Sequence, residues 1–583
     1  MMKVFKDLSW FFRQEWKSYL KGIFLLFLIA FLQLIPPRIV GETADEMSRG
    51  ELTIGRLFFW LSLLIGTGLI LYIFRYYWRI YIFGSSLKLA RQLRKQLYDH
   101  FTKMSSAFYQ RRRIGDLMAH ATNDVQAVQQ TAGAGILTLV DSILTGGFVI
   151  LTMALSIDWR LTIISLLPMP IIALMTNIYG AKLHRRFRKA QEAFSDLNDK
   201  TLESISGIKV IKTFGQEKED IEDFRKQSED VVLKNIAVAK IDALYDPTIS
   251  GIVGLSLFLS IGVGAKFVLD GAITIGQLIS FNTYLGLLIW PMLAFGMLFN
   301  ILERGRASYD RIQQLLAEPV DIKDAEDAVM QVPSGDIDFH VDKFTYPNDD
   351  EPVLKNIHFY LKKGNTLGIV GKTGSGKTTL IKLLLREFEG YDGAISIGGI
   401  PINQYQLKAY RQAFGYVPQD QFLFSTTIRE NIAFARPDAT DEEIMQAAKI
   451  ADIHNDILHF AEGYDTVVGE RGVSLSGGQK QRISIARALV LNPEILILDD
   501  SLSAVDANTE EQILAALKEN RAGKTTIISS HRLSAIQHAD LILVLQDGTI
   551  AESGNHEELM ARDGWYRKMY YQQQLESLVE RGG

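Results

Sequence analysis

Long apolar blocks dominate the first part of the chain and are absent from the rest. Six segments of roughly 20 or more mostly apolar residues occur there: 18–40, 57–83, 131–157, 161–180, 248–269 and 274–299. A bilayer core is roughly 30 Å thick and a helix rises about 1.5 Å per residue, so this length is typical of membrane-spanning helices. The pattern predicts an all-α membrane domain with six spans. Pro291 and several glycines interrupt the last two segments, which membrane helices tolerate.

The charges between these segments indicate an orientation. The segment 41–53 is acidic and the turns 156–160 and 270–274 are short, whereas 84–130 and 181–247 are rich in Lys and Arg. Positive charge is retained on the cytoplasmic side, so the two long segments are expected to be cytoplasmic. Six spans then place both termini in the cytoplasm. The first apolar run lacks a small-residue cleavage site, which favours an uncleaved membrane helix over a signal peptide.

The two long basic segments show helical periodicity. They are expected to extend pairs of membrane helices into the cytoplasm, with short turns near 114–124 and 204–216. These segments could be solvated helical hairpins without a further role, or they could contact the domain that follows. The similar lengths of the two segments favour contact with that domain.

From about Asp336 the pattern changes to short apolar strands alternating with helices, which predicts an α/β domain with a largely parallel sheet. The expected organisation is a transmembrane domain over 1–313, a Pro-containing acidic linker over 314–335, and the α/β domain over 336–583.

The sequence GKTGSGKT lies between a predicted strand and a predicted helix, where a phosphate-binding loop belongs. Its glycines let backbone N–H groups surround phosphates at the positive end of the helix. Lys377 is predicted to reach the β and γ phosphates of ATP, and the Thr378 hydroxyl to bind Mg²⁺. The predicted nucleotide-binding residues of this loop are Gly371, Lys372, Thr373, Gly374, Ser375, Gly376, Lys377, Thr378 and Thr379.

The segment EILILDD (494–500) reads as a buried parallel strand with two carboxylates at its end. Ligands of open α/β sheets bind at the carboxyl ends of the strands. Asp499 is predicted to hold Mg²⁺ through water, and Asp500 occupies the position of a general base.

Charge and composition exclude several other chemistries. The net charge of −5 comes without a basic stripe, which argues against a P-loop ATPase that acts on nucleic acid. The chain has no cysteine, which excludes disulfides, zinc–thiolate sites and thiol nucleophiles.

The complete set of motifs resembles the ATP-binding cassette (ABC) superfamily over essentially the whole chain. In order these are Tyr346, GKTGSGKT, Gln419 in YVPQD, LSGGQ (475–479), ILILDD, SAVD (503–506) and His531 in SSHRLS. The resemblance implies that Tyr346 stacks on adenine and that Gln419 contacts Mg²⁺ and the attacking water. It also implies that His531 holds the γ-phosphate and orients the base. In this family one chain's P-loop and another chain's signature sandwich ATP, so Ser476, Gly477, Gly478 and Gln479 would serve a partner.

Within the superfamily, the chain is similar to half-size bacterial multidrug exporters. It most resembles the C-type subunit of the heterodimeric LmrC–LmrD, EfrC–EfrD and BmrC–BmrD type. The family usually has Glu after the Mg²⁺-binding Asp, whereas this chain has Asp500. We therefore expect a slow ATP site in a heterodimer that exports hydrophobic or cationic drugs through a bacterial cell membrane. A homodimer in which Asp500 still acts as the base, a lipid flippase and a peptide exporter are the alternatives.

Asp141 lies well inside the third apolar segment. An ionisable residue there is costly unless it faces water or the interior of the bundle. Two roles remain open: lining the transport cavity near cationic substrates, or hydrogen bonding a neighbouring helix.

Overall fold

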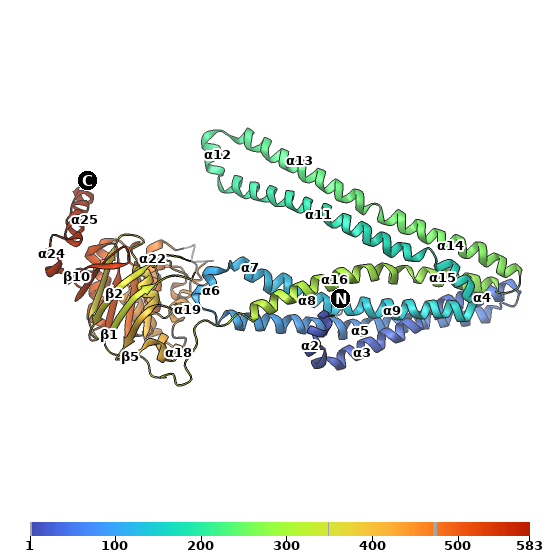
Figure 1. The fold of residues 1–583 in the computed structure, drawn as a ribbon, viewed down its shortest axis with the longest axis horizontal. Coiled ribbons are helices and arrows are strands. Elements are labelled where there is room, and N and C mark those ends of the chain that lie inside the picture. Colours follow the sequence, from blue (N-terminus) through green and yellow to red (C-terminus); the bar gives the residue numbers. More distant parts are fainter. Residues whose placement is uncertain (1–2, 348, 470–474, 583) are drawn as a thin grey trace. The chain divides into compact units, whose positions relative to one another are not determined.

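The computed structural model describes residues 3–347, 349–469 and 475–582. The chain divides into two compact units (Figure 1). The helical unit comprises Met1–Thr102 and Gly115–Glu318, and the α/β unit comprises Lys103–Ile114 and Pro319–Gly583. The predicted fold class, an all-α membrane domain with an α/β nucleotide-binding domain, is confirmed.

The helical unit is built from long helices broken at prolines and at short π-helical turns. Its helices are α1 (Lys3–Asp7), α2 (Ser9–Gln14), α3 (Trp16–Leu32), α4 (Ile35–Ser48), α5 (Ile54–Phe101), α7 (Ile114–Ala119), α8 (Val125–Gln130), α9 (Ile136–Thr152), α10 (Trp159–Leu166), α11 (Met169–Ser206), α12 (Ile208–Phe214), α13 (Glu217–Asp242), α14 (Tyr245–Leu269), α15 (Ile275–Leu287) and α16 (Ile289–Leu316). The π-helical turns are η1 (His120–Asp124), η2 (Thr131–Gly135) and η3 (Met153–Asp158).

Five helical stretches in the described part of the chain are long and apolar enough to cross a membrane. They are Trp16–Ser48, Ile54–Phe101, Ile114–Leu166, Glu217–Leu269 and Ile275–Leu316. The segment 161–180, expected to be a further span, is divided between α10 and α11. Pro168 lies at this break. The helix is interrupted there because proline cannot donate the hydrogen bond that a continuous helix needs.

Helices α11 and α13 run side by side with α12 at their tip (Figure 1). The turn expected near 204–216 lies here. Asp220 on α13 accepts a hydrogen bond from Ser204 Oγ at 2.9 Å and pairs with Lys200 Nζ at 2.8 Å. These contacts join the two helices immediately before the tip.

At the other end of the helical unit, α4 and α15 approach closely. A Cβ added at Gly41 would lie 2.4 Å from the carbonyl oxygen of Gly276, so only glycine permits this contact. The buried Asp45 carboxylate accepts from Gly276 N at 2.7 Å and from Thr274 Oγ1 at 2.5 Å. It thereby satisfies donors at the start of α15 that would otherwise be left unpaired.

The α/β unit contains two sheets. The first has four antiparallel strands in the order β2-β1-β4-β5 and the second has six in the order β10-β9-β3-β8-β7-β6. Strands β9, β3, β8, β7 and β6 are parallel, and β10 pairs antiparallel with β9. The strands are β1 (Ile337–Phe344), β2 (Leu354–Leu361), β3 (Thr366–Gly371), β4 (Asp392–Ile397), β5 (Ile400–Pro401), β6 (Phe414–Val417), β7 (Ile495–Asp499), β8 (Thr525–Ser529), β9 (Leu541–Gln546) and β10 (Thr549–Gly554).

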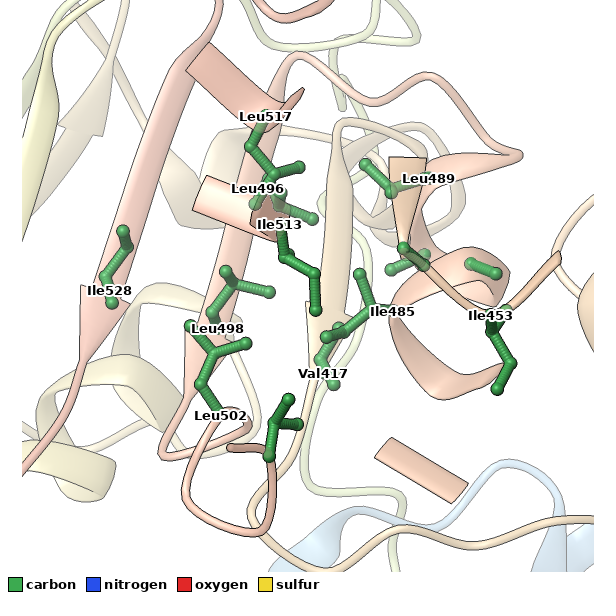
Figure 2. Close-up of a cluster of buried hydrophobic side chains, with 14 of the residues drawn as sticks. Val417, Ile453, Ile485, Leu489, Leu496, Leu498, Leu502, Ile513, Leu517 and Ile528 are labelled. Carbon is green, nitrogen blue, oxygen red and sulfur yellow. The ribbon is translucent and has the colours of Figure 1, made fainter. Parts of the chain in front are cut away.

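The α/β unit also contains helices. They are α17 (Lys377–Leu384), α18 (Leu407–Gln412), α19 (Ile428–Ala433), α20 (Asp441–Ile450), α21 (His454–His459), α22 (Gly477–Leu489), α23 (Ala507–Asn520), α24 (His556–Ala561) and α25 (Trp565–Gly582), and α6 (Ser106–Arg111) also belongs to this unit. Figure 2 shows one of the hydrophobic cores, where Ile485 of α22 and Ile513 of α23 lie near Leu496 and Leu498 of β7. Because both faces of β7 are buried, its apolar residues form an unbroken run.

Candidate nucleotide site

The strand order of the six-stranded sheet brings four predicted functional segments to one edge. The GKTGSGKT loop follows β3, His531 follows β8, the Asp499–Asp500 pair ends β7, and Gln419 follows β6. These four strands are consecutive in the sheet and parallel. Their carboxyl ends therefore meet at the edge where open α/β sheets bind ligands.

The glycines of the phosphate-binding loop occupy positions that other residues would not fit. Gly374 and Gly376 have φ values of +83° and +100°. A Cβ added at Gly371 would lie 2.2 Å from the carbonyl oxygen of Leu545. The hydroxyl of Ser375 is buried without a hydrogen-bond partner in the described part of the chain. A tight loop with an unsatisfied donor before a helix fits the phosphates of a nucleotide.

Lys377 begins α17 and is buried. Its Nζ donates to the carbonyl oxygens of Gly371 at 2.9 Å and Lys372 at 3.1 Å, so the side chain folds back along the loop. Burial lowers the pKa of Lys377, and the nearby carboxylates of Asp500 and Asp499 oppose this. An ammonium group in this position is suited to pairing with phosphate oxygens.

Thr378 and Asp499 place two oxygen ligands next to each other. Thr378 Oγ1 donates to Asp499 Oδ1 at 3.4 Å, and Asp499 is almost fully buried. Burial raises the pKa of Asp499, which a bound cation would offset. Hydroxyl and carboxylate oxygens are the ligands that Mg²⁺ prefers, so these residues fit the predicted metal site.

Gln419 and Asp500 lie next to each other. Gln419 Nε2 donates to Asp500 Oδ2 at 3.4 Å. The backbone of Asp500 has a φ of +48°, and its N–H donates to the carbonyl oxygen of Ser529 at 2.8 Å. The position of the carboxylate is therefore determined by the length of its side chain, because the main chain is held in place.

His531 follows β8, the strand next to β7, which ends at Asp499. Strand register places Asp499 opposite Ser529, two residues before His531. The carbonyl oxygen of His531 accepts from Gln573 Nε2 at 2.8 Å, while its side chain is exposed. This arrangement leaves the imidazole able to face a nucleotide at the same edge.

Tyr346 follows β1 and connects the antiparallel sheet to the loop. Its hydroxyl lies 3.0 Å from Thr379 Oγ1, directly after the P-loop lysine and threonine. The ring packs edge-on against Phe388 and Phe344, with centroids 5.1 Å away in both cases. Burial raises the pKa of Tyr346, so the phenol is neutral. The ring is thus fixed next to the P-loop helix, where adenine is expected.

The LSGGQ segment starts α22. Ser476 Oγ accepts from Gln479 N at 3.2 Å, and Gln479 Oε1 accepts from Ser476 N at 3.1 Å, which is a capping box. A Cβ added at Gly478 would lie 3.0 Å from the carbonyl oxygen of Ala504. Among the described residues, no hydrogen bond connects this segment with the P-loop. The signature residues are thus held by the cap at the start of their own helix.

Sequence analysis did not identify the two residues that position the SAVD segment. Gln481 on α22 accepts from Ala504 N at 3.0 Å, and Arg532 donates to the carbonyl oxygen of Val505 at 3.1 Å. Arg532 also pairs with the buried Glu510 at 2.8 Å. The spacing of Gln481 from Ile485, which puts this glutamine on the buried face of α22, is the signal that could have revealed it.

Asp141 on α9 accepts a hydrogen bond from Thr145 Oγ1, one turn along the same helix, at 3.0 Å. The structure thus gives Asp141 a partner on its own helix and leaves both proposed roles open.

The first cytoplasmic turn was expected near 114–124, and this position is wrong. Helix α5 ends at Phe101, and the chain forms the separate helix α6 before α7 begins at Ile114. The reason is the pair Ala107 and Phe108, which are buried in an otherwise polar stretch. Ala107 joins the hydrophobic core of the α/β unit, so this turn is part of that unit.

We expect Ala107→Glu to abolish most ATP-driven transport, because it puts a charge into a hydrophobic core contact of α6. ATP affinity should change less than about threefold, since the P-loop is not altered. ATP-driven uptake of ethidium into inside-out vesicles, measured beside nucleotide binding, tests this. Gly115→Glu is the matched control, because Gly115 is exposed and a Cβ there meets nothing within 4 Å. Equal transport by both variants would contradict a role for α6.

Comparison with known proteins agrees with this geometry. Residues 19–292 match the family described as "ABC transporter transmembrane region", and residues 354–503 match "ABC transporter". The chain belongs to the ABC transporter family, and it is an ATPase that couples hydrolysis to transport.

Its relatives include bacterial proteins of the same length. It is 49% identical to the "multidrug resistance-like ATP-binding protein MdlA" of Escherichia coli (strain K12), over 99% of this chain and 98% of that protein. It is 47% identical to the "probable multidrug resistance ABC transporter ATP-binding/permease protein YheI" of Bacillus subtilis (strain 168), over the whole of both chains. The structure of a bacterial Atm1-family ABC exporter with ATP bound matches with a TM-score of 0.79 at 27% identity, over 96% of this chain and 99% of that one.

Proposed function

We propose that this chain is one subunit of an ATP-driven exporter of hydrophobic or amphipathic drugs, with its ATP-binding domain and both termini in the cytoplasm. Its relatives in Escherichia coli and Bacillus subtilis carry multidrug resistance in their names. The apolar helices and the basic character of 84–130 and 181–247 support the orientation. ATP would bind with Mg²⁺ held by Thr378, Asp499 and Gln419.

The observation that carries the more specific proposal is Asp500 at the base position. Its side chain is one methylene shorter than Glu, so its carboxylate ends about 1 Å short of a water placed for Glu. A misplacement of that size can cost around 100-fold in rate. The backbone N–H of Asp500 donates to the carbonyl oxygen of Ser529, which holds the main chain in place. The ATP site built on this P-loop is therefore a slow one.

A partner subunit is part of this proposal, because the resemblance to the ABC family implies that ATP is held between one chain's P-loop and another chain's signature. We propose that LSGGQ of this chain completes the partner's ATP site, whose P-loop and Glu catalyse hydrolysis. The tip helix α12 offers a further surface for that partner. Ile208, Val210 and Phe214 are apolar and exposed there. An exposed apolar tip on a long hairpin is typical of a docking element.

We expect Asp500→Asn to leave more than half of the ATP turnover of the complex with its partner, because the other site does most of the hydrolysis. Steady-state ATPase of the co-purified complex is the measurement. The matched control replaces the partner's base in the same way, carboxylate by amide, so that its Glu becomes Gln. This change should remove nearly all turnover. The proposal fails if Asp500→Asn is the more damaging of the two changes.

A further inference from the structure

Among the residues that the structure describes, the largest fully buried side chain is that of Arg386, just beyond the P-loop helix. Arg386 follows α17 with a φ of +53° and is 2% exposed. Its guanidinium donates to the carbonyl oxygens of Lys323 and Tyr405, each at 3.0 Å, and pairs with Glu389 at 2.9 Å. A buried guanidinium needs such acceptors, so these contacts fix the end of α17 against the chain at Lys323.

The chain at Lys323 belongs to the segment that connects the two units, residues 319–330, called the connecting segment below. It is attached to the α/β unit at further points. Asp324 Oδ1 accepts from Leu407 N at 2.7 Å. The main chain of Val329 donates to Gln404 at 2.8 Å and accepts from Gln406 at 2.9 Å. The connecting segment is therefore a docked part of the unit rather than a flexible tether.

The connecting segment also holds α6, the turn between two membrane helices. Asp321 Oδ2 accepts from Ser105 Oγ at 2.7 Å and lies 3.5 Å from Arg111 Nη2. Next to Arg386, Glu387 Oε2 accepts from Ser106 Oγ at 3.1 Å. Two consecutive residues at the end of the P-loop helix thus hold α6, one directly and one through the connecting segment.

We infer that the connecting segment is a coupling element: it carries movements of the P-loop helix, through Arg386 and Asp321, to α6. The inference rests on the coupling of ATP hydrolysis to transport and is independent of the proposed slow site and partner. Arg386 and Asp321 are positioning residues, since neither is placed at the nucleotide.

Stability and coupling are expected to respond differently. The Asp321–Arg111 pair is partly exposed, and such pairs contribute little to folding. Loss of a contact that couples the movements of two elements instead changes the rate of ATP turnover. Loss of the Asp321 contact should therefore lower kcat while leaving KM for ATP and the thermal midpoint nearly unchanged.

The experiment uses the absence of cysteine in this chain. In the full-length protein in nanodiscs, Ser105→Cys and Asp321→Cys together remove the hydrogen bond, and a short bis-methanethiosulfonate reagent restores a link that dithiothreitol removes. In the reduced form we expect kcat for ATP about fivefold below that of the unaltered chain, with KM for ATP unchanged. Bridging should restore kcat to within about twofold of the unaltered chain.

Three results would overturn the inference: full turnover in the reduced form, no recovery on bridging, or inactivation on bridging. The last would show that α6 and the connecting segment must separate during the cycle. If the double variant does not fold, Asp321→Ala replaces it, with Asp327→Ala in the same segment as the matched control. Equal kcat values for these two variants would then contradict the coupling role.

Discussion

Gly477→Glu is expected to reduce ATP turnover of the complex about 100-fold, the scale seen when a group that stabilises transferred charge is lost. Gly477 is the first residue of α22, and its exposed N-terminus is suited to phosphates. A carboxylate there would repel the nucleotide bound by the partner's P-loop.

Size alone does not predict this loss. A Cβ added at Gly477 would lie 3.6 Å from Ala504 Cβ, an ordinary van der Waals distance. Gly477→Ala should therefore keep most of the turnover, and it serves as the control in the same ATPase measurement. Similar activity of the Glu and Ala variants would show that this segment does not face phosphate.

Lys377→Ala is the second change with a large expected effect. The lysine is buried in the phosphate loop, where its Nζ donates to the carbonyl oxygen of Gly371, and its charge is suited to pairing with phosphate oxygens. Loss of a charge-assisted contact costs on the order of 1.5–3 kcal/mol, which corresponds to about 10- to 150-fold weaker ATP binding at this P-loop.

Binding of a fluorescent ATP analogue to the complex, with the partner's P-loop inactivated, measures this affinity. Lys382→Ala, further along α17, is the control and should bind within about threefold of the unaltered chain. The thermal midpoint should be similar for both variants. Unchanged affinity in Lys377→Ala would contradict the assigned role.

The sequence was sufficient to predict which segments follow the parallel strands at this edge, because the information for each segment is local. A glycine-rich loop between a strand and a helix, and carboxylates ending an apolar strand, each specify their own position in a parallel sheet. The strand order then brought Gln419 to Asp500 and placed Thr378 against Asp499. The sequence pattern predicted each segment separately, but it did not predict these contacts between side chains.

Contacts between distant segments could not be predicted in this way. The helix α6 forms where Ala107 finds a hydrophobic core some 230 residues further along the chain, beginning with Ile337. Arg386 follows a helix and would be expected to be exposed, yet it is buried, and the carbonyl oxygens of Lys323 in the connecting segment and of Tyr405 accept hydrogen bonds from it. The expected linker 314–335 has a polar and acidic sequence. Its attachment to the α/β unit depends on contacts with residues 404–407, which its own sequence does not indicate.

The most direct test of the slow-site proposal is the ATPase rate of this chain purified alone in nanodiscs, compared with its Asp500→Glu variant. Without a partner, any pair of chains has Asp500 at both sites. The account predicts slow hydrolysis by the unaltered chain and a rise of about tenfold or more in kcat for Asp500→Glu, with KM for ATP nearly unchanged. Rapid hydrolysis by the unaltered chain that Asp500→Glu does not increase would contradict it.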